Sequence, residues 1–365
     1  MHIERKPKLR AALGGLALAT ATAISLPATA AETINLTAID GYPPKSLWVK
    51  EFINFFIPEI DRRLAKTGNY KIKWNQAWGG QIAKKKGVLK ALQNGLGDIG
   101  VVTTVFHSDK VPLQMIAYAT PFVSTDPTLV ARTVDKLVNS YPEYKAAWAK
   151  YNQVYLTNLA VLDSYQIVSK TPMMALPDFK GKKVAGAGMN LGYLKGFGAA
   201  GVGGSLVTYY NKLKTGVVDA AMIWAEAANT FKMVEVAPHM LKGDIGTVNS
   251  KAITMNVKSW NKLPDEVKKA ISEAAPAYRD HMGKTALAIA KASYMKYEKA
   301  GGKIVQMSAT ERDKWAQTMP NIATSWAANL EKKGIPGKKI LKAYMDEMRA
   351  AKQPILRHWD QEVGG

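Results

Sequence analysis

Hydrophobic and polar positions along the chain follow two periods, that of a β-strand and that of an α-helix. Residues Thr33–Ile39 alternate and are rich in β-branched side chains, which predicts a first strand. Apolar side chains at helical spacing follow and predict an amphipathic helix: Trp48, Phe52, Phe55, Phe56, Ile60 and Leu64. A strand at Tyr70–Trp74, a helix at Lys85–Asn94 and a strand at Ile99–Val102 come next. This alternation predicts an α/β fold.

A short pattern of a helix end, a glycine, an aspartate and a strand occurs twice. Leu92–Asp98 and Leu213–Asp219 share the spacing Leu-x-x-Gly-x-x-Asp. The glycine suits the left-handed cap of a helix, and the aspartate is expected to bond backbone rather than ligand. The repeat predicts two α/β lobes with parallel strands. The second lobe is expected to start near Val154–Val168 and to contain a strand at Lys183–Ala185.

The last third of the chain has a helical pattern. Leu263-Pro264-Asp265-Glu266 is a helix start, and the helix is expected to continue to Lys299 with a kink at Pro276. A strand at Ile304–Met307, a capping box at Ser308–Glu311 and a helix at Lys338–Ala351 follow. Two lobes followed by long helices suggest a hinged receptor.

The first thirty residues have the pattern of a secretory signal peptide. Four basic residues precede the apolar stretch Ala11–Leu26, and Ala28-Thr29-Ala30 fits a cleavage site. We therefore expect export to the periplasm and removal of residues 1–30.

Composition narrows the function by exclusion. The chain of 365 residues contains no cysteine, which excludes disulfides and thiol nucleophiles. The net charge is +21, but the lysines are scattered, with one run of three at Lys84–Lys86, so no nucleic-acid partner is expected. The histidines beyond the signal lack metal-ligand spacing, and no nucleophile elbow or phosphate loop occurs. These features predict a monomeric binding protein that is not an enzyme and has no cofactor or metal.

The predicted strand ends point to a cleft, because ligands of parallel α/β sheets bind beyond the carboxyl ends of the strands. Aromatic and polar residues at these ends are the candidate ligand-binding residues: Asp40, Gly41, Tyr42, Trp78, Thr103, Thr104, Asp163, Tyr165, Gly186, Trp224 and Glu226. Four other tryptophans lie in helical patterns and are assigned to the core: Trp48, Trp148, Trp315 and Trp326.

Several segments, taken in order, resemble the solute-binding proteins of TRAP transporters. The resemblance rests on Gly80–Gly100, Pro121–Val123, Leu176–Val184, Leu213–Asp219 and Trp260–Pro264, and it covers nearly the whole chain after the signal. It implies a type II-like, two-lobed periplasmic binding protein. Such a receptor closes on a small organic solute about hinge strands, here near Thr157–Leu162 and Thr247–Met255. It then delivers the solute to a TRAP-type membrane permease.

The resemblance also suggests a domain division. The first lobe is expected at 31–157 with 250–262, the second at 158–249, and long helices that pack on both lobes at 263–365. The order of the segments and the late helix favour the TRAP type over the receptor of an ATP-driven importer. An exported hydrolase is the rival from another class, but no histidine lies at a predicted strand end.

One departure from the family pattern concerns the ligand. In the family, an arginine that grips the ligand carboxylate follows the second-lobe strand motif, and Ala185 stands at that position here. The arginines beyond the signal all lie in helical or C-terminal segments: Arg62, Arg63, Arg132, Arg279, Arg312, Arg349 and Arg357. Because a planar fork for carboxylate is missing, an amine, amino alcohol or zwitterion is the first expectation. A carboxylate or sulfonate held by Lys195 and backbone N–H groups around Gly186–Gly188 is the alternative.

Overall fold

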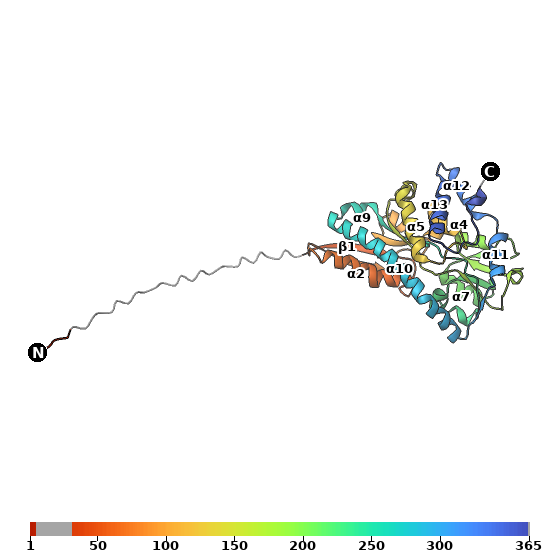
Figure 1. Ribbon diagram of the computed structural model, residues 1–365, viewed down its shortest axis with the longest axis horizontal. Coiled ribbons are helices and arrows are strands. Elements are labelled where there is room, and N and C mark those ends of the chain that lie inside the picture. The colour runs from red at the N-terminus through yellow and green to blue at the C-terminus, as the bar shows by residue number, and fades with distance from the viewer. Residues whose placement is uncertain (5–30, 364–365) are drawn as a thin grey trace.

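The computed structural model describes residues 1–4 and 31–363. The predicted signal peptide and its cleavage site fall on residues 5–30, outside the described residues. From Glu32 onward the chain forms two β-sheets surrounded by helices (Figure 1). This is the two-lobed α/β architecture expected from the sequence.

The first sheet has five strands in the order β2-β1-β3-β10-β4. Their bounds are β1 Glu32–Ile39, β2 Tyr70–Ala77, β3 Ile99–Thr103, β4 Gln153–Leu159 and β10 Lys251–Asn256. Strand β1 is parallel to β2 and β3, whereas β10 is antiparallel to both β3 and β4. Every residue of β3 and β10 is buried, which explains their lack of polar alternation.

The second sheet has six strands in the order β11-β9-β5-β8-β6-β7. Their bounds are β5 Gln166–Ser169, β6 Lys183–Gly186, β7 Ala200–Gly203, β8 Ala220–Ile223, β9 His239–Lys242 and β11 Lys303–Gln306. Strand β6 is parallel to β7 and β8, and β5 is antiparallel to β8 and β9.

Two expectations about the strands were therefore wrong. The sheets are mixed, because β10 runs antiparallel to both of its neighbours in the first sheet and β5 to both of its neighbours in the second. Val154, taken as the earliest start of the second lobe, lies in β4 of the first sheet, where it pairs with Met255.

The crossing segments 160–165 and 243–250 lie side by side. The Tyr165 amide donates to the Gly246 carbonyl at 3.1 Å, and the Thr247 hydroxyl donates to the Leu162 carbonyl at 2.6 Å. The Gly246 amide donates to the Ser164 hydroxyl at 2.8 Å. The two connections between the sheets are thus tied to each other by hydrogen bonds.

Helices cover both sheets, and the longest is α10. Their bounds are α1 Leu47–Glu51, α2 Ile57–Leu64, α3 Val88–Gln93, α4 Ile116–Ala119, α5 Pro127–Ser140, α6 Glu143–Ala149, α7 Leu206–Lys214, α8 Ala225–Thr230, α9 Val257–Lys262, α10 Asp265–Lys299, α11 Ala309–Thr318, α12 Ile322–Glu331 and α13 Gly337–Ala350. A π-helical turn at Phe52–Phe56 joins α1 to α2. Helix α10 includes Pro276 and contacts α2, α5 and β4 of the first lobe and α8 and β11 of the second (Figure 1). Within the described residues, no helix is both long and apolar enough to cross a membrane.

The repeated helix–glycine–aspartate pattern has the same structure in both lobes. Gly95 after α3 and Gly216 after α7 both have φ of +73°, the left-handed conformation that glycine adopts without strain. The Asp98 carboxylate accepts from the Thr37 amide of β1 at 2.7 Å. Asp219 accepts from the Lys183 amide at the start of β6 at 2.8 Å. Both aspartates bond backbone, as expected, and fasten a neighbouring strand in each sheet.

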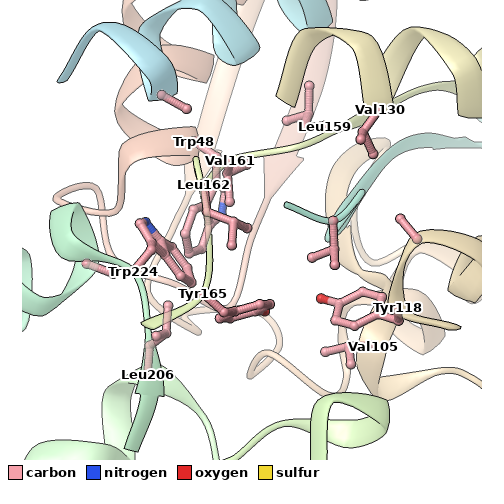
Figure 2. Close-up of a cluster of buried hydrophobic side chains, with 14 of the residues drawn as sticks. Trp48, Val105, Tyr118, Val130, Leu159, Val161, Leu162, Tyr165, Leu206 and Trp224 are labelled. Atoms are coloured by element: carbon pink, nitrogen blue, oxygen red, sulfur yellow. The ribbon is translucent and has the colours of Figure 1, made fainter. Parts of the chain in front are cut away.

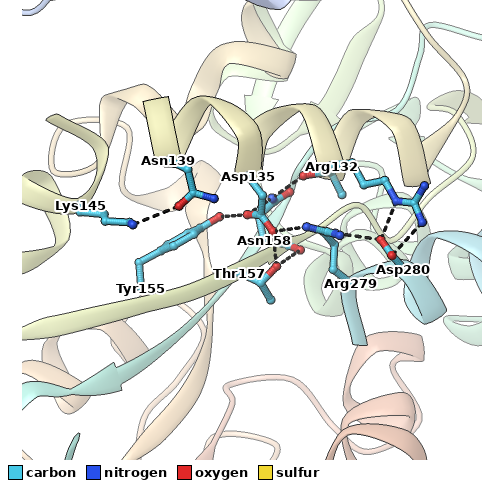
Figure 3. Close-up of polar contacts among 10 residues, drawn as sticks. Arg132, Asp135, Asn139, Lys145, Tyr155, Thr157, Asn158, Arg279 and Asp280 are labelled. Carbon is cyan, nitrogen blue, oxygen red and sulfur yellow. Dashed lines mark hydrogen bonds and ion pairs between the residues drawn. The ribbon is translucent and has the colours of Figure 1, made fainter. Parts of the chain in front are cut away.

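A polar cluster inside the first lobe joins α5, β4 and α10 (Figure 3). The Asp135 carboxylate accepts from Tyr155 at 2.7 Å, Thr157 at 2.6 Å, Asn158 at 2.8 Å and the Arg279 guanidinium at 2.7 Å. Four donors satisfy both carboxylate oxygens, so this buried charge is fully paired.

Candidate ligand-binding site

Side chains from both lobes meet around a closed cavity of about 30 Å³. The first lobe and its crossing segment contribute residues at one end of the first sheet: Tyr42, Thr103, Val105, Phe106, Tyr118, Ser250 and Lys251. The second lobe and its crossing segment contribute the opposite wall: Tyr165, Ala187, Asn190, Ser205, Leu206, Tyr209, Met222 and Trp224. The cavity has room for about one water molecule, which is less than an organic solute needs.

The walls of the cavity are mainly aromatic. Tyr165 lies between Trp224 and Tyr118, and the Tyr118 hydroxyl points toward it (Figure 2). The rings of Tyr165 and Trp224 meet edge to face, with centroids 6.0 Å apart. The Trp224 indole N–H donates to the Glu226 carboxylate at 3.0 Å, which fixes the ring. The site therefore offers rigid apolar faces with hydroxyl groups at their edges.

Lys251 is the one charged residue on the cavity wall among the described residues. It is 3% exposed, and its ammonium donates to the Thr103 hydroxyl at 3.1 Å. The same nitrogen lies 4.0 Å from the centre of the Trp48 ring and 4.9 Å from that of Tyr42. Burial lowers the pKa of Lys251 to about 7, and the nearby Asp40 carboxylate offsets only a part of this decrease.

Asp40 lies behind Lys251 and does not line the cavity. Its carboxylate accepts from the Trp48 indole N–H at 2.7 Å and from the Tyr42 amide at 3.0 Å. Burial raises the pKa of Asp40, whereas the Lys251 charge and these N–H donors lower it. The Trp48 indole thus lies between the two groups, with its N–H on the carboxylate and its face on the ammonium.

Two hydroxyls of the cavity wall have no hydrogen-bond partner within the described part of the chain. They belong to Ser205 and Ser250, which are 2% and 4% exposed. Unsatisfied buried hydroxyls cost stability and are uncommon in native proteins. Ser250 precedes Lys251, so a donor hydroxyl and an ammonium come from adjacent residues at one end of β10.

Four of the predicted ligand-binding residues line the cavity: Tyr42, Thr103, Tyr165 and Trp224. Thr104 is buried beside it and donates to the Asn249 carbonyl at 3.2 Å. Asp40 supports Lys251 from behind, as described above. Trp48, assigned to the core, is buried there as expected and also contacts both charged groups.

The other predicted residues lie away from the cavity wall. Trp78 packs on Phe52 with ring centroids 5.2 Å apart. Asp163, in the first crossing segment, accepts from the Tyr294 hydroxyl at 3.0 Å. Glu226 accepts from Trp224 and Thr230. Burial raises the pKa of both carboxyl groups, so neither is a strong counter-charge for a cation.

Ala185 and Gly186 lie in β6, where they are buried by neighbouring strands. Ala185 pairs with Val202 and Ala221, and a Cβ on Gly186 would approach the Asn190 side-chain oxygen to 2.6 Å. None of the arginines in the described residues lines the cavity, because each is bonded elsewhere: Arg62, Arg63, Arg132, Arg279, Arg312, Arg349 and Arg357. The site therefore has no guanidinium fork.

A larger groove of about 780 Å³ lies between α12, the 3₁₀ turn Pro112–Met115 and the 3₁₀ segment Gly188–Leu194. Lys195 and Gly188, the alternative anion-binding residues, line this groove and not the closed cavity. The groove is bordered by two further lysines, Lys332 and Lys333, which are exposed to solvent. It lacks the buried, convergent polar groups of the cavity, so we assign the candidate site to the latter.

Sequence reasoning missed Lys251, Ser250, Ser205, Asn190, Tyr118 and Tyr209. The rule of strand carboxyl ends applies to parallel strands, but β10 is antiparallel and brings its amino end to the same edge. The only sequence signal is weak: Lys251 directly precedes Ala252–Met255, which is apolar except for Thr254, and this does not show which way the strand runs.

Two mixed α/β lobes, two hydrogen-bonded crossings and an enclosed aromatic cavity between the lobes define a solute-binding receptor. The model of bacterial extracellular solute-binding protein family 7 (DctP) matches residues 43–355. The chain belongs to this family, which is the TRAP solute-binding family, and it is a receptor and not an enzyme.

Solved structures have the same fold. A TRAP periplasmic solute-binding protein from Desulfovibrio salexigens is similar with a TM-score of 0.74 and 22% identity, over 87% of this chain and 96% of that one. One from Bordetella bronchiseptica, with bound (R)- and (S)-mandelate, has a TM-score of 0.76 and 20% identity, over 87% and 99%. One from Rhodoferax ferrireducens, in complex with copurified benzoate, has a TM-score of 0.77 and 17% identity, over 87% and 98%.

Proposed function

We propose that this chain is the periplasmic receptor of a TRAP transporter for a small organic monoanion, which it delivers to the membrane permease. The observation that carries the proposal is the Lys251 ammonium on the cavity wall beside the unpartnered Ser250 hydroxyl. An ammonium has three N–H donors, and Lys251 uses one of them on Thr103. A carboxylate bridging Lys251 and Ser250 would satisfy both groups.

This ligand class differs from the first expectation of an amine, amino alcohol or zwitterion. A cation would have to approach the Lys251 charge, while the acids proposed to balance it, Asp163 and Glu226, lie off the cavity wall. A carboxylate is favoured even without an arginine, because Lys251 binds it as a point charge instead of a planar fork. The mandelate and benzoate carried by two structural neighbours are consistent with a monocarboxylate.

The proposed net charge of the ligand follows from the charges around the cavity. One ammonium faces it in the described structure, and no second cation lies on the wall to receive a second carboxylate. A dianion would leave one charge desolvated and unpaired, at a cost of several kcal/mol. The ligand is therefore a monoanion with an apolar part that packs on Tyr165 and Trp224.

The proposal includes closure about the two crossing segments. We place the hinge at 160–165 and 243–250, with the first lobe before and after these segments and the second lobe between them. Their mutual hydrogen bonds allow both segments to bend together. Solution scattering should show a smaller radius of gyration on saturation with ligand, and an unchanged radius would remove the hinge from the proposal.

A thermal-shift screen with matched pairs tests the ligand class. Benzoate, mandelate and pyroglutamate are compared with benzamide, mandelamide and pyroglutamide, which keep the ring and remove the charge, and with benzylamine, which reverses it. A ligand at 100 times its dissociation constant adds about 2.7 kcal/mol to the unfolding free energy. We expect stabilisation by carboxylates alone. Stabilisation by the amine or amides alone would reverse the ligand class and leave the receptor assignment intact.

The permease partner needs a separate test. Genes for two membrane subunits of unequal size, and none for an ATPase, should lie next to the gene for this chain. Transport of the screened ligand by those subunits in vesicles should require this protein.

A further inference from the structure

The buried lysine on the cavity wall has one carboxylate near it, and the ligand cannot reach that carboxylate. We infer that Asp40 is a positioning residue that keeps the Lys251 ammonium charged in the closed cleft. This inference rests on the proposed function, because it concerns the charge that holds the proposed monoanion.

The geometry supports an indirect role. Asp40 is 1% exposed and lies off the cavity wall, fixed by the N–H groups of Trp48 and Tyr42. The face of the same Trp48 ring lies 4.0 Å from the Lys251 nitrogen. A rotation of either charged side chain would therefore lose contacts with Trp48.

The energetic need is clear from the burial of Lys251. A buried ammonium without a counter-charge loses its proton instead of remaining charged. Aromatic faces offset a part of that cost. The negative charge of Asp40 is the influence that raises the pKa of Lys251, against the desolvation that lowers it.

Few other titratable groups face this pair. Around Asp40 these groups are Tyr42 on the same loop, Lys251 on β10 and Tyr278 on α10. The negative charge of Glu51 in α1 contributes to raising the pKa of Tyr278. Tyr278 donates to the Trp48 carbonyl, and burial raises its pKa, so it stays neutral over the working pH range. Among these groups, Asp40 is therefore the one that opposes the effect of burial on the charge of Lys251.

The test is the pH profile of anion binding in wild type and in Asp40→Asn. Benzoate, mandelate and pyroglutamate are titrated by calorimetry from acidic to alkaline pH. Affinity is expected to fall where Lys251 loses its proton, and this fall should begin at lower pH in Asp40→Asn. Each pH unit of displacement corresponds to about tenfold weaker binding on the alkaline side. On the acidic side the variant should bind as tightly as wild type or more tightly, because a negative charge near the anion is gone.

If Asp40 had only a structural role, the pH profile of anion binding in Asp40→Asn would be different. If Asp40→Asn weakens binding by the same factor at every pH, or does not change it, the inference is overturned while the proposed function stands. Asp98→Asn is the matched control, since Asp98 accepts from a backbone amide in the same sheet but fastens β1. Its pH profile should coincide with that of wild type.

A second measurement does not depend on the ligand. The Trp48 indole N–H resonance of the ligand-free protein, assigned with Trp48→Phe, should shift with pH as Lys251 titrates. In Lys251→Met the remaining shift reports the Asp40 carboxylate, which accepts this N–H, and should move to higher pH because the Lys251 charge is gone. In Asp40→Asn the shift reports Lys251 alone and should move to lower pH. If the midpoint stays in place or rises in Asp40→Asn, the inference is wrong. If no carboxylate binds but the midpoint moves as expected, the proposed ligand class fails and the role of Asp40 stands.

Discussion

The first lobe buries two aspartates, and the completeness of their pairing differs. Asp135 accepts from four donors, one of which is positively charged (Figure 3). These donors are Tyr155, Thr157, Asn158 and Arg279. Asp40 has N–H donors, but its positive partner, Lys251, is bonded to Thr103 and otherwise faces aromatic rings and the cavity. The first cluster holds α5, β4 and α10 together. The second leaves bonding capacity for a solute, as expected of a binding site.

The same difference extends to neutral groups. In the Asp135 cluster the hydroxyls of Tyr155 and Thr157 both donate to the carboxylate. Around the cavity, the hydroxyls of Ser205 and Ser250 have no partner in the described structure. A protein selected for stability alone would bond or remove such groups. These two unpartnered hydroxyls line the same cavity as the buried Lys251, and the following predictions test this contrast with the Asp135 cluster.

Asp135→Ala should have the largest effect, and that effect should be on stability. The change leaves three neutral donors and one N–H of Arg279 without an acceptor, while Arg279 keeps its ion pair with Asp280, so the unfolding free energy should fall by about 3–5 kcal/mol. Urea unfolding followed by circular dichroism measures this. The control Arg132→Ala breaks an ion pair with Asp280 in which the arginine is 54% exposed, and it should cost less than about 1 kcal/mol. Equal losses of unfolding free energy in the two variants would contradict the view that Asp135 holds α5, β4 and α10 together.

Lys251→Met should have the next largest effect, and that effect should be on binding. The variant keeps a side chain of similar length and removes the charge, so affinity for a monocarboxylate should fall at least about 30-fold, or about 2 kcal/mol. Calorimetry with the best carboxylate from the screen measures this.

Lys242→Met is the control for this change. Lys242 also contacts an aromatic ring, with its nitrogen 5.3 Å from the centre of Tyr294, but it lies outside the cavity wall. Its replacement should leave the affinity unchanged. If Lys251→Met bound the carboxylate as tightly as wild type, the anion proposal would fail.

Ser250→Ala should change stability and binding in opposite directions. Loss of an unsatisfied buried hydroxyl should raise the unfolding free energy by about 1 kcal/mol, whereas loss of a donor to a carboxylate should weaken binding about tenfold. Thermal unfolding and calorimetry on one preparation measure both. Ser259→Ala should lower the unfolding free energy and leave the affinity unchanged, because its hydroxyl is bonded to Asp98 and does not line the cavity. If Ser250→Ala instead lowered the unfolding free energy and left the affinity unchanged, the hydroxyl would have a structural role.

The sequence predicts the fold better than the site, for a physical reason. Local patterns identify β1 and α10, and the glycines at 95 and 216 have the conformation that their position predicts. The rule of strand carboxyl ends found Tyr42, Thr103 and Trp224, whereas Tyr165 lines the cavity from the amino end of the antiparallel β5. Lys251 could not be placed because its contribution depends on strand direction, which is set by the long-range pairing of β10 with β3 and β4. Asp163 likewise bonds to a residue far away in the sequence, Tyr294. The sequence therefore could not show that the side chain of Asp163 lies off the cavity wall.

Asp163→Asn should give the smallest effect, and it appears in the pH dependence of stability. Burial raises the pKa of Asp163 in the folded chain above its unfolded value. Its contribution to stability is therefore fully present below the unfolded pKa and is lost as pH rises through the folded pKa. Asparagine does not titrate and still offers an oxygen to the Tyr294 hydroxyl. Between acidic and neutral pH the unfolding free energy of the variant should therefore rise relative to that of wild type.

Urea unfolding at a series of pH values checks this gain, with Glu59→Gln as the contrasting variant. Hydrogen bonding from Arg62 lowers the pKa of Glu59, so the contribution of Glu59 is present above its unfolded pKa and is lost as pH falls. The two differences from wild type should therefore change with pH in opposite directions. Because Asp163 lies off the cavity wall, Asp163→Asn should change monocarboxylate affinity by less than about threefold, well below the effect of removing a direct charged contact. A larger loss of affinity would mean that Asp163 takes part in ligand binding and does not have a purely structural role.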